Sequence, residues 1–398
     1  MTIRGKAHIA GAYEHPRRDI PDRTLTQIHA EVALGALADA GLSVDDVDGY
    51  IGDSSVPGFG PLSFVDYMGM RCSYVDSTET GGSSYIAHVG HASSAIAAGK
   101  ANVVLITLAG KPRQMRGAGM RPPAGFGSGG DGPPEASFEM MWGLGGAPYQ
   151  YAMAATRHMH EFGTTSRQLA EIKVAASLHA QHNPDAFLQK PVTVEEVLAS
   201  PMVSDPLHRL DCCVITDGGG ALIVTRPEIA RDLARAAGRP TVQVLGHGEA
   251  PKGNANGVDL TYSGAVWSGP RAFEEAGVSH ADVKYASIYD SFTITVLMQI
   301  EDLGFCAKGE GGRFVSDGAL VAPHGRLPFN TDGGGLCNNH PGNRGGMTKV
   351  IEAVRQLRGE AHPEVQVPDC DIALAHGTGG SLATRMGSAT VVLAREDA

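Results

Sequence analysis

Apolar residues recur along the chain at two spacings, and these spacings predict helices that lead into strands. Ile28, Val32 and Ala36 recur every four positions, which is the spacing of one face of an α-helix. Gly41 ends this pattern, and the apolar residues among positions 47–51 predict a short strand. The first unit that the pattern predicts is therefore a helix followed by a strand.

The same alternation continues through the rest of the chain. We expect helices over residues 84–98, 149–162, 166–182 and 347–357. We expect strands over residues 7–12, 102–108, 217–224, 241–247 and 371–376. Strands that alternate with helices predict βαβ units around a largely parallel sheet, so the fold class is α/β.

One short phrase of the sequence occurs twice. Residues 40–47 and 276–283 share Ala-Gly, Ser and Asp-Val at equivalent positions, and 276 less 40 gives an offset of 236. Each copy ends a predicted helix and leads into a predicted strand. An internal duplication is the economical interpretation.

A long segment interrupts the first of the two halves. Residues 117–134 are rich in Gly and Pro, which predicts a loop, and two helices follow before the next buried strand. We therefore expect an N-terminal half formed by residues 1–110 and 211–240, and a C-terminal half formed by residues 241–398. The inserted loop domain, residues 111–210, is expected to cover a substrate site.

Charge and composition narrow the classes of function. The chain has 398 residues, with 32 Lys and Arg against 43 Asp and Glu, and its net charge is −11. This negative net charge, with no block of Lys and Arg in the sequence, argues against a groove that binds nucleic acid. A few local cations or a helix N-terminus still suffice for a small anionic ligand.

The compartment follows from the apolar runs and the cysteines. No apolar stretch reaches the roughly 18 residues of a membrane span, and the first 22 residues mix charges into their apolar positions, unlike a signal peptide. The six Cys form no CxxC pair, and no Cys or His cluster has the spacing of a metal site. We predict a cytoplasmic protein with free thiols, no bound metal and no membrane partner.

Four loops rich in Gly and polar residues stand at the edges of predicted strands and helices. They are residues 79–84, 288–292, 333–342 and 375–380. In open α/β sheets, ligands bind at the carboxyl ends of the strands. Any one of these loops is explained as a turn, but four at matching points of a duplicated fold predict an active site.

The sequence resembles the thiolase superfamily, in the branch of sterol-carrier-protein-type thiolases and bacterial lipid-transfer thiolase-like proteins. The motifs that carry the resemblance are Asp211–Cys213, Asp217–Ala221, Tyr289–Phe292, Asn330–Gly335, His340–Gly342 and His376–Gly380. The resemblance covers nearly the whole chain. It implies the thiolase fold, in which two duplicated βαβαβ halves form five α/β/α/β/α layers with an inserted loop domain. It also implies an acyl-CoA substrate bound under that domain.

The chain departs from a working thiolase at one position. The resemblance places the nucleophilic Cys at the N-terminus of the long first-half helix, where the helix dipole lowers its pKa. Counting back from Gly99, that position is Gly82. Glycine has no side chain to acylate, so we expect no acyl-enzyme at this position.

Three side chains remain as catalytic candidates. Tyr289 stands where the sterol-carrier-type thiolases have a His, and the resemblance identifies His340 as the family His that precedes Pro-Gly. His376 stands in the loop where many thiolases have a second Cys. Each of the three is able to donate or accept a proton.

Further positions are expected to bind the substrate. Those expected to hold the thioester or enolate oxygen are Gly81, Gly82, Ser83, Asn339, Asn343 and Gly379. Those expected to contact the CoA phosphates are Arg113, Arg116 and Arg121. Coenzyme A would be part of the substrate rather than a bound cofactor.

The resemblance implies chemistry beside the thioester carbonyl. Related proteins without the Cys carry out retro-aldol cleavage of β-hydroxyacyl-CoA, usually with Tyr in both the second and the third loop, whereas this chain has Tyr289 and His340. We therefore expect a lyase, a homodimer or homotetramer, with a small OB-fold/zinc-ribbon accessory protein as a possible partner. Two alternatives are a non-catalytic acyl-CoA or lipid-binding or scaffold subunit, and a conventional thiolase that uses another Cys.

Overall fold

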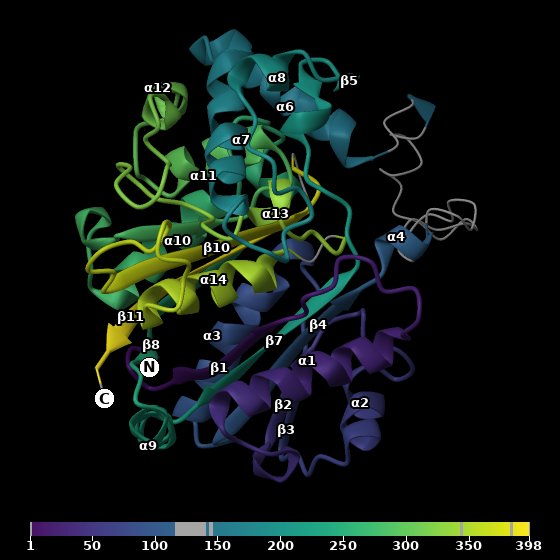
Figure 1. The fold of residues 1–398 in the computed structure, drawn as a ribbon, viewed down its shortest axis with the longest axis vertical. Coiled ribbons are helices and arrows are strands. Elements are labelled where there is room, and N and C mark those ends of the chain that lie inside the picture. The colour runs from purple at the N-terminus through teal and green to yellow at the C-terminus, as the bar shows by residue number, and fades with distance from the viewer. Residues whose placement is uncertain (1, 116–140, 143–145, 343–344, 383–384, 398) are drawn as a thin grey trace.

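The computed structural model contains a nine-stranded sheet that joins the two halves of the molecule, with helices on both of its faces (Figure 1). It describes residues 2–115, 141–142, 146–342, 345–382 and 385–397. Among these residues, no helix is long and apolar enough to cross a membrane.

The predicted elements are present in both halves. The first half contains β1 (His8–Glu14), α1 (Leu25–Ala40), β2 (Gly49–Gly52), α2 (Pro61–Met68), β3 (Tyr74–Ser77), α3 (Ser84–Ala97), β4 (Val103–Gly110), β7 (Gly218–Thr225) and α9 (Pro227–Ala237). The second half contains β8 (Thr241–Lys252), α10 (Ala265–Ala276), β9 (Tyr285–Ile288), α11 (Thr293–Asp302), α12 (Gly311–Val315), α13 (Gly334–Cys337), α14 (Gly346–Arg358), β10 (Ile372–Gly380) and β11 (Met386–Glu396).

The order of the strands repeats outward from the centre of the sheet. Strands β1 and β8 pair antiparallel at the centre, and the order on the two sides is β7-β4-β2-β3 and β11-β10-β9. On each side the next two pairings are antiparallel and the third is parallel. The two halves therefore share this topology, as the internal duplication predicts, apart from β3, which has no counterpart among the described residues of the second half.

The expectation of a largely parallel sheet is wrong, because among the strands of the described residues only β2–β3, β2–β4 and β9–β10 pair in parallel. The connection from β10 to β11 spans only residues 381–385, which is too short for the crossover that a parallel pair needs. The equivalent connection, between β4 and β7, contains the long insertion, and these two strands are also antiparallel. The sheet is therefore mixed.

The repeated phrase folds in the same way twice. Helices α1 and α10 both end at a glycine in the left-handed conformation, Gly41 and Gly277, where a side chain would be strained. In each copy, a serine N–H and hydroxyl then donate to an aspartate three residues later, at 2.8 Å in the first copy and 2.7 Å in the second. Strands β2 and β9 start at positions 49 and 285, so the offset of 236 holds in the structure.

Helices α3 and α14 lie in the middle of the molecule and contact strands of both halves as well as each other. Helix α1 covers the outer face of the first half, and α10 covers that of the second (Figure 1). The two halves of the sheet therefore form two layers with α3 and α14 between them, and the order of the layers is helix, sheet, helix, sheet, helix. The central helices begin at the loops that the sequence identifies as candidate sites.

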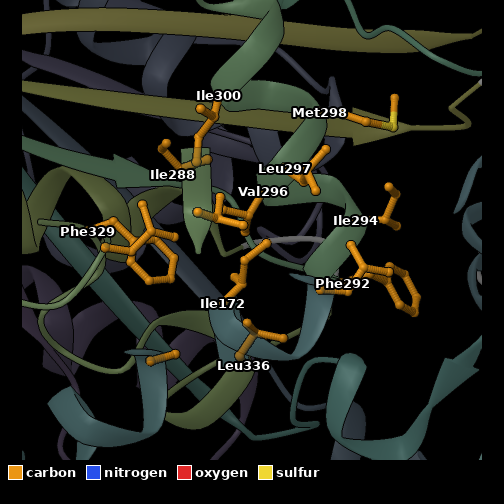
Figure 2. Close-up of a cluster of buried hydrophobic side chains, with 14 of the residues drawn as sticks. Ile172, Ile288, Phe292, Ile294, Val296, Leu297, Met298, Ile300, Phe329 and Leu336 are labelled. Carbon is orange, nitrogen blue, oxygen red and sulfur yellow. The ribbon is translucent and has the colours of Figure 1, made fainter. Parts of the chain in front are cut away.

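The chain leaves the sheet after β4 and returns to it at β7. Between them, the described residues form α4 (Pro112–Met115), α6 (Ala147–Phe162), α7 (Ser166–Ala180), α8 (Val194–Leu198), β5 (Met202–Ser204) and β6 (Leu207–His208). Helix α7 packs on α11, α12 and α13. Figure 2 shows Ile172 of α7 among Val296, Leu297 and Leu336, so this region shares an apolar core with the second half.

Candidate active site

The Tyr289 ring occupies the place of a side chain at Gly82. Ile288 pairs with His376 in the parallel β9–β10 ladder, so Tyr289, one residue further, turns to the face of the sheet that α3 covers. A Cβ atom added at Gly82 would lie only 2.5 Å from Cζ of Tyr289, whereas real Cβ contacts stay beyond about 3 Å. The main-chain carbonyl of Thr378 is equally close, so the Tyr289 ring and this carbonyl together exclude a side chain at position 82.

Tyr289 and His340 form a buried hydrogen-bonded pair. The Tyr289 Oη and the His340 Nε2 atoms lie 2.9 Å apart. Burial lowers the pKa of His340 to about 4; Asp290 opposes this shift and Lys349 adds to it. Burial also raises the pKa of Tyr289 well above its usual value. At neutral pH both side chains are therefore uncharged, and a proton lies between an imidazole and a phenol.

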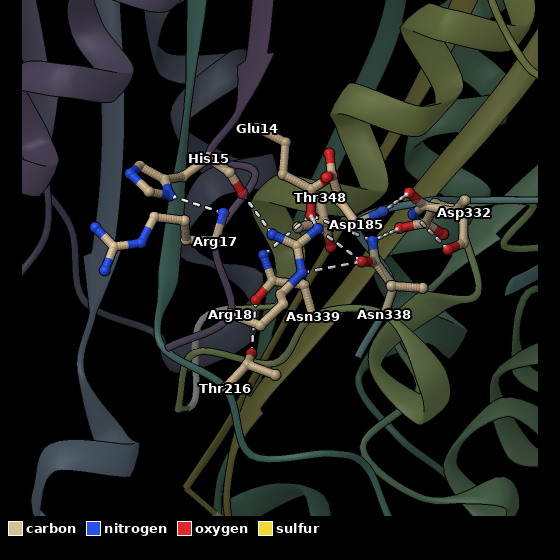
Figure 3. Close-up of polar contacts among 12 residues, drawn as sticks. Glu14, His15, Arg17, Arg18, Asp185, Thr216, Asp332, Asn338, Asn339 and Thr348 are labelled. Atoms are coloured by element: carbon tan, nitrogen blue, oxygen red, sulfur yellow. Dashed lines mark hydrogen bonds and ion pairs between the residues drawn. The ribbon is translucent and has the colours of Figure 1, made fainter. Parts of the chain in front are cut away.

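A chain of hydrogen bonds fixes the main chain at His340. Its N–H donates to the Thr216 hydroxyl at 2.9 Å, and that hydroxyl donates to the Asn339 amide oxygen at 2.7 Å. The Asn339 amide nitrogen donates in turn to Glu14 at 3.0 Å. Figure 3 shows Thr216, Asn339 and Glu14 of this chain beside Arg18, which bonds to both Glu14 and Asn338. The network ties the His340 loop to the end of β1.

Asn339 therefore differs from the expectation that it faces the substrate. Its amide oxygen and its amide nitrogen both bond to protein groups, and the residue is fully buried. The side chain orients Thr216 and, through it, the main chain of His340.

The structure does not bring His376 to the Tyr289–His340 pair. Its side chain lies on the opposite face of β10, where Nδ1 is 2.8 Å from the Thr390 hydroxyl and Thr390 contacts Ser268 of α10. Burial lowers the pKa of His376 to about 3, so the ring is neutral. The expectation that His376 lies with the other catalytic candidates is corrected: it lies in the core between the sheet and α10, because adjacent residues of a strand point to opposite faces.

The glycines of the first and fourth loops permit close contact of two backbones. A Cβ atom at Gly379 would lie 2.5 Å from the Gly82 nitrogen. The Gly81 N–H donates to the Glu79 carboxylate at 2.8 Å, and the Ser83 hydroxyl donates to the Thr80 carbonyl at the same distance. The loops meet as the sequence suggests, but the Gly81 N–H and the Ser83 hydroxyl bond to the protein itself.

The predicted phosphate contacts are described only in part. Arg113 lies over the Phe187 ring at 5.0 Å, and its guanidinium donates to the Ile215 carbonyl at 3.3 Å. Arg116, Arg121 and Asn343 lie outside the described residues. Binding of CoA phosphates by Arg113 stays a prediction.

None of the cysteines has the environment of an activated nucleophile. All six are free thiols, and burial raises the pKa of each of them. For Cys337, burial outweighs the nearby Lys173, whose ammonium lies 3.1 Å from the sulfur. A thiol with a raised pKa holds its proton at neutral pH and is a weak nucleophile.

Sequence reasoning did not single out Asp290 and Lys349. The Asp290 carboxylate accepts the N–H groups of Gly335 at 2.8 Å and Leu336 at 3.1 Å, and Lys349 lies 2.9 Å from it. The available signal was a lysine inside the apolar pattern of residues 347–357, since a buried lysine needs a charged partner.

Known proteins resemble this chain over most of its length. It is 36% identical to the 17-hydroxy-3-oxo-4-pregnene-20-carboxyl-CoA lyase of Mycobacterium tuberculosis, over 90% of this chain and 92% of that protein. It is 35% identical to the steroid side-chain-cleaving aldolase of Thermomonospora curvata, with the same coverage of both chains.

Solved structures and a family model agree with these relatives. The structure of the Ltp2-ChsH2(DUF35) aldolase superposes with a TM-score of 0.85 and 32% identity, over 99% of both chains. Human mitochondrial 3-ketoacyl-CoA thiolase shares the fold, with a TM-score of 0.70 and 14% identity over the full length of both chains. Residues 251–395 match the family described as thiolase C-terminal domain-like. The chain therefore belongs to the thiolase superfamily, in the sterol-carrier-protein-type, lipid-transfer branch that also contains the steroid side-chain aldolases.

Proposed function

We propose that the protein is a lyase that cleaves the Cα–Cβ bond of a β-hydroxyacyl-CoA thioester without an acyl-enzyme. The observation that carries this proposal is the Tyr289 ring, which fills the space of a nucleophile at Gly82 and bonds to a neutral His340. The names of the relatives suggest that the acyl body is a steroid.

The pair supplies the proton acceptor for the retro-aldol step. The β-hydroxyl gives its proton to the Tyr289 oxygen while the proton of Tyr289 moves to Nε2 of His340. The Cα–Cβ bond breaks, its electron pair forms the enolate of the shortened thioester, and the β-carbon becomes a carbonyl. Return of the proton to Cα completes the reaction. Because His340 is neutral at neutral pH, it is able to take up this proton.

The enolate oxygen needs a positive partner. Helix α3 begins at Ser84, beside Gly82, and the N-terminus of a helix carries a partial positive charge. We place the thioester oxygen at this helix start, where the developing charge is stabilised.

A partner and a second copy belong to the same proposal. The matched aldolase structure pairs two components by name, which supports an accessory subunit for this chain.

In the described part of the chain, β3 pairs only with β2 and so leaves a sheet edge, and Phe59, Leu62 and Tyr67 nearby are exposed. Exposed edges and apolar patches favour association, so we propose a homodimer through this edge. Analytical ultracentrifugation of the pure chain measures this directly.

The test is to incubate the pure protein with β-hydroxyacyl-CoA esters, with and without free CoA, and to follow every CoA species by mass spectrometry. A lyase gives a shortened thioester without free CoA. Products that require free CoA would indicate thiolysis, and binding without turnover would favour the carrier or scaffold alternative.

The matched variant is Tyr289→Phe. We expect turnover to fall by about 10²- to 10⁴-fold, since the phenyl ring keeps the packing but loses the proton relay. Tyr50→Phe is the control, because Tyr50 is also buried and its hydroxyl lies 2.8 Å from the Thr107 hydroxyl. Equal turnover in both variants would refute the role of Tyr289.

A further inference from the structure

One carboxylate joins the two loops that bear the proposed catalytic pair. Asp290 is the direct neighbour of Tyr289 in the chain. It accepts the N–H groups of Gly335 and Leu336, which lie in α13, a few residues before His340. The loop after β9 and the loop before α14 are therefore fixed to each other at this carboxylate.

The partner of this carboxylate comes from a third element. Lys349 lies in the first turns of α14, and its Nζ is 2.9 Å from Oδ1 of Asp290. The side chains of both residues are only 1% exposed. Burying two charges costs solvation that their attraction seldom exceeds, so a buried ion pair is weak evidence for stability and calls for another explanation.

The other charged groups around His340 have hydrogen-bond partners of their own, and Lys349 also acts on Asp332 and Glu14. Glu14 bonds to Arg18 at 2.9 Å and lies 3.4 Å from Arg355. Asp332 accepts hydrogen bonds from Asn338 and from the N–H of Gly334. The remaining titratable groups near the site are Cys213, Tyr151, Lys173, Cys337 and Glu352. Asp290 lies beside the ring, since a Cβ atom added at Gly335 would be 3.1 Å from both Oδ1 of Asp290 and Cδ2 of His340. Among the described residues, Asp290 and Lys349 are the charged groups that shift the pKa of His340.

We propose that Asp290 and Lys349 are the positioning pair of the active site: Asp290 holds the Tyr289 loop against α13, and Lys349 balances the charge of Asp290 beside the His340 ring. This inference rests on the proposed function for its catalytic meaning. The geometry of the pair is independent of the proposed function.

The two charges act on His340 in opposite directions. Asp290 raises the pKa of His340, and Lys349 lowers it. Removing the charge of Lys349 alone therefore leaves an uncompensated carboxylate beside the imidazole. The pKa of His340 must then rise, and a larger fraction of His340 is protonated and unable to accept the substrate proton.

The experiment is an NMR titration of the His340 ring in protein with labelled histidine, with the His340 signal assigned by its loss in His340→Gln. Lys349→Met should raise the pKa of His340 and move the acidic limb of the lyase pH profile to higher pH. Lys349→Gln, which keeps a donor for Asp290, should shift both in the same direction and serves if the Met variant does not fold.

Two further variants make the result specific. Lys173→Met removes an equally buried lysine that contacts the same loop through the Leu336 carbonyl, and the pKa of His340 should not change. The double variant Asp290→Asn/Lys349→Met removes both charges, and the pKa should return towards the wild-type value. Equal shifts in the Lys349 and Lys173 variants, or no shift in any variant, would overturn the inference.

The titration also separates this inference from the proposed function. It needs no turnover, so a protein without lyase activity still reports whether the pair controls His340. If Lys349→Met raises the pKa while the wild-type protein cleaves no thioester, the proposed function fails and the control of His340 by the pair stands.

Discussion

The loops that precede α3 and α14 occupy equivalent places in the two halves, yet only the second carries a side chain of the proposed catalytic pair. Ahead of α14, the loop keeps His340. Ahead of α3, the loop has Gly82, and the Tyr289 ring fills its place. The two loops touch, since a Cβ atom at Gly346 would lie 3.1 Å from the carbonyl carbon of Gly82. The duplication thus provides two equivalent loop positions. In the proposed site, side chains of the second half, Tyr289 and His340, occupy both.

The strongest way to break this comparison is to restore a side chain in the first half. Gly82→Cys should not create a thiolase, because the new side chain and the Tyr289 ring need the same space. We expect a stability loss of about 1–3 kcal/mol from overpacking and a loss of lyase turnover of about 10²-fold or more. Urea unfolding and product analysis measure the two effects.

Gly82→Ala separates volume from thiol chemistry in that test. Alanine should impair the protein nearly as much as cysteine, because the clash begins at Cβ. Full lyase turnover in either variant would contradict the account of this position.

Two histidines sharpen the comparison within the second half. His340→Ala should lower turnover by about 10²- to 10⁴-fold, because it removes the proton acceptor. His376→Ala should leave most of the turnover and cost about 1–3 kcal/mol of stability, because it empties space in the core and removes one of the two buried partners of the Thr390 hydroxyl. Steady-state kinetics and thermal unfolding of both variants test this, and the reverse result would place the site at His376.

The smallest expected effect concerns how α3 joins the halves. His91 on α3 lies 3.1 Å from Asp76 of β3 and 3.2 Å from Glu249 of β8. The hydrogen bond to Glu249 is the main cause that raises the pKa of His91 in the folded state. The ion pairs therefore stabilise the fold fully below about pH 6.5, the unfolded value, and this contribution disappears as pH rises through the raised folded pKa.

Because these partners are partly exposed, the contribution is about 0.2–1 kcal/mol. Urea unfolding of wild type and His91→Gln across this pH range measures it. The difference in unfolding free energy should shrink as pH increases, and a constant difference would show that the ion pairs contribute nothing.

The sequence was sufficient to predict the repeat because its signals are local. The helix end at Gly41, the capped turn of Ser43 and the following strand depend on neighbouring residues, and the copy at Gly277 follows the same rules. The direction of strand pairing is not determined by neighbouring residues. It depends on how β7 and β11 return to the sheet, and here the expectation was wrong.

The candidate site divides along the same line. The loops that bear Tyr289 and His340 were identified from their motifs, and their bond is a product of the fold. His376 was misplaced because the face of a strand residue depends on its register with β9, and adjacent residues point to opposite faces. Lys349 was missed because its partner Asp290 lies 349 − 290 = 59 residues earlier, and only the fold brings the two together.

The central claim is that the protein breaks a C–C bond beside a thioester without becoming acylated. Intact-protein mass spectrometry during turnover of a β-hydroxyacyl-CoA ester tests it most directly. The account predicts an unmodified protein mass while the shortened thioester accumulates. An acyl adduct that a single Cys→Ala substitution abolishes would contradict the account and identify a conventional thiolase with a displaced nucleophile.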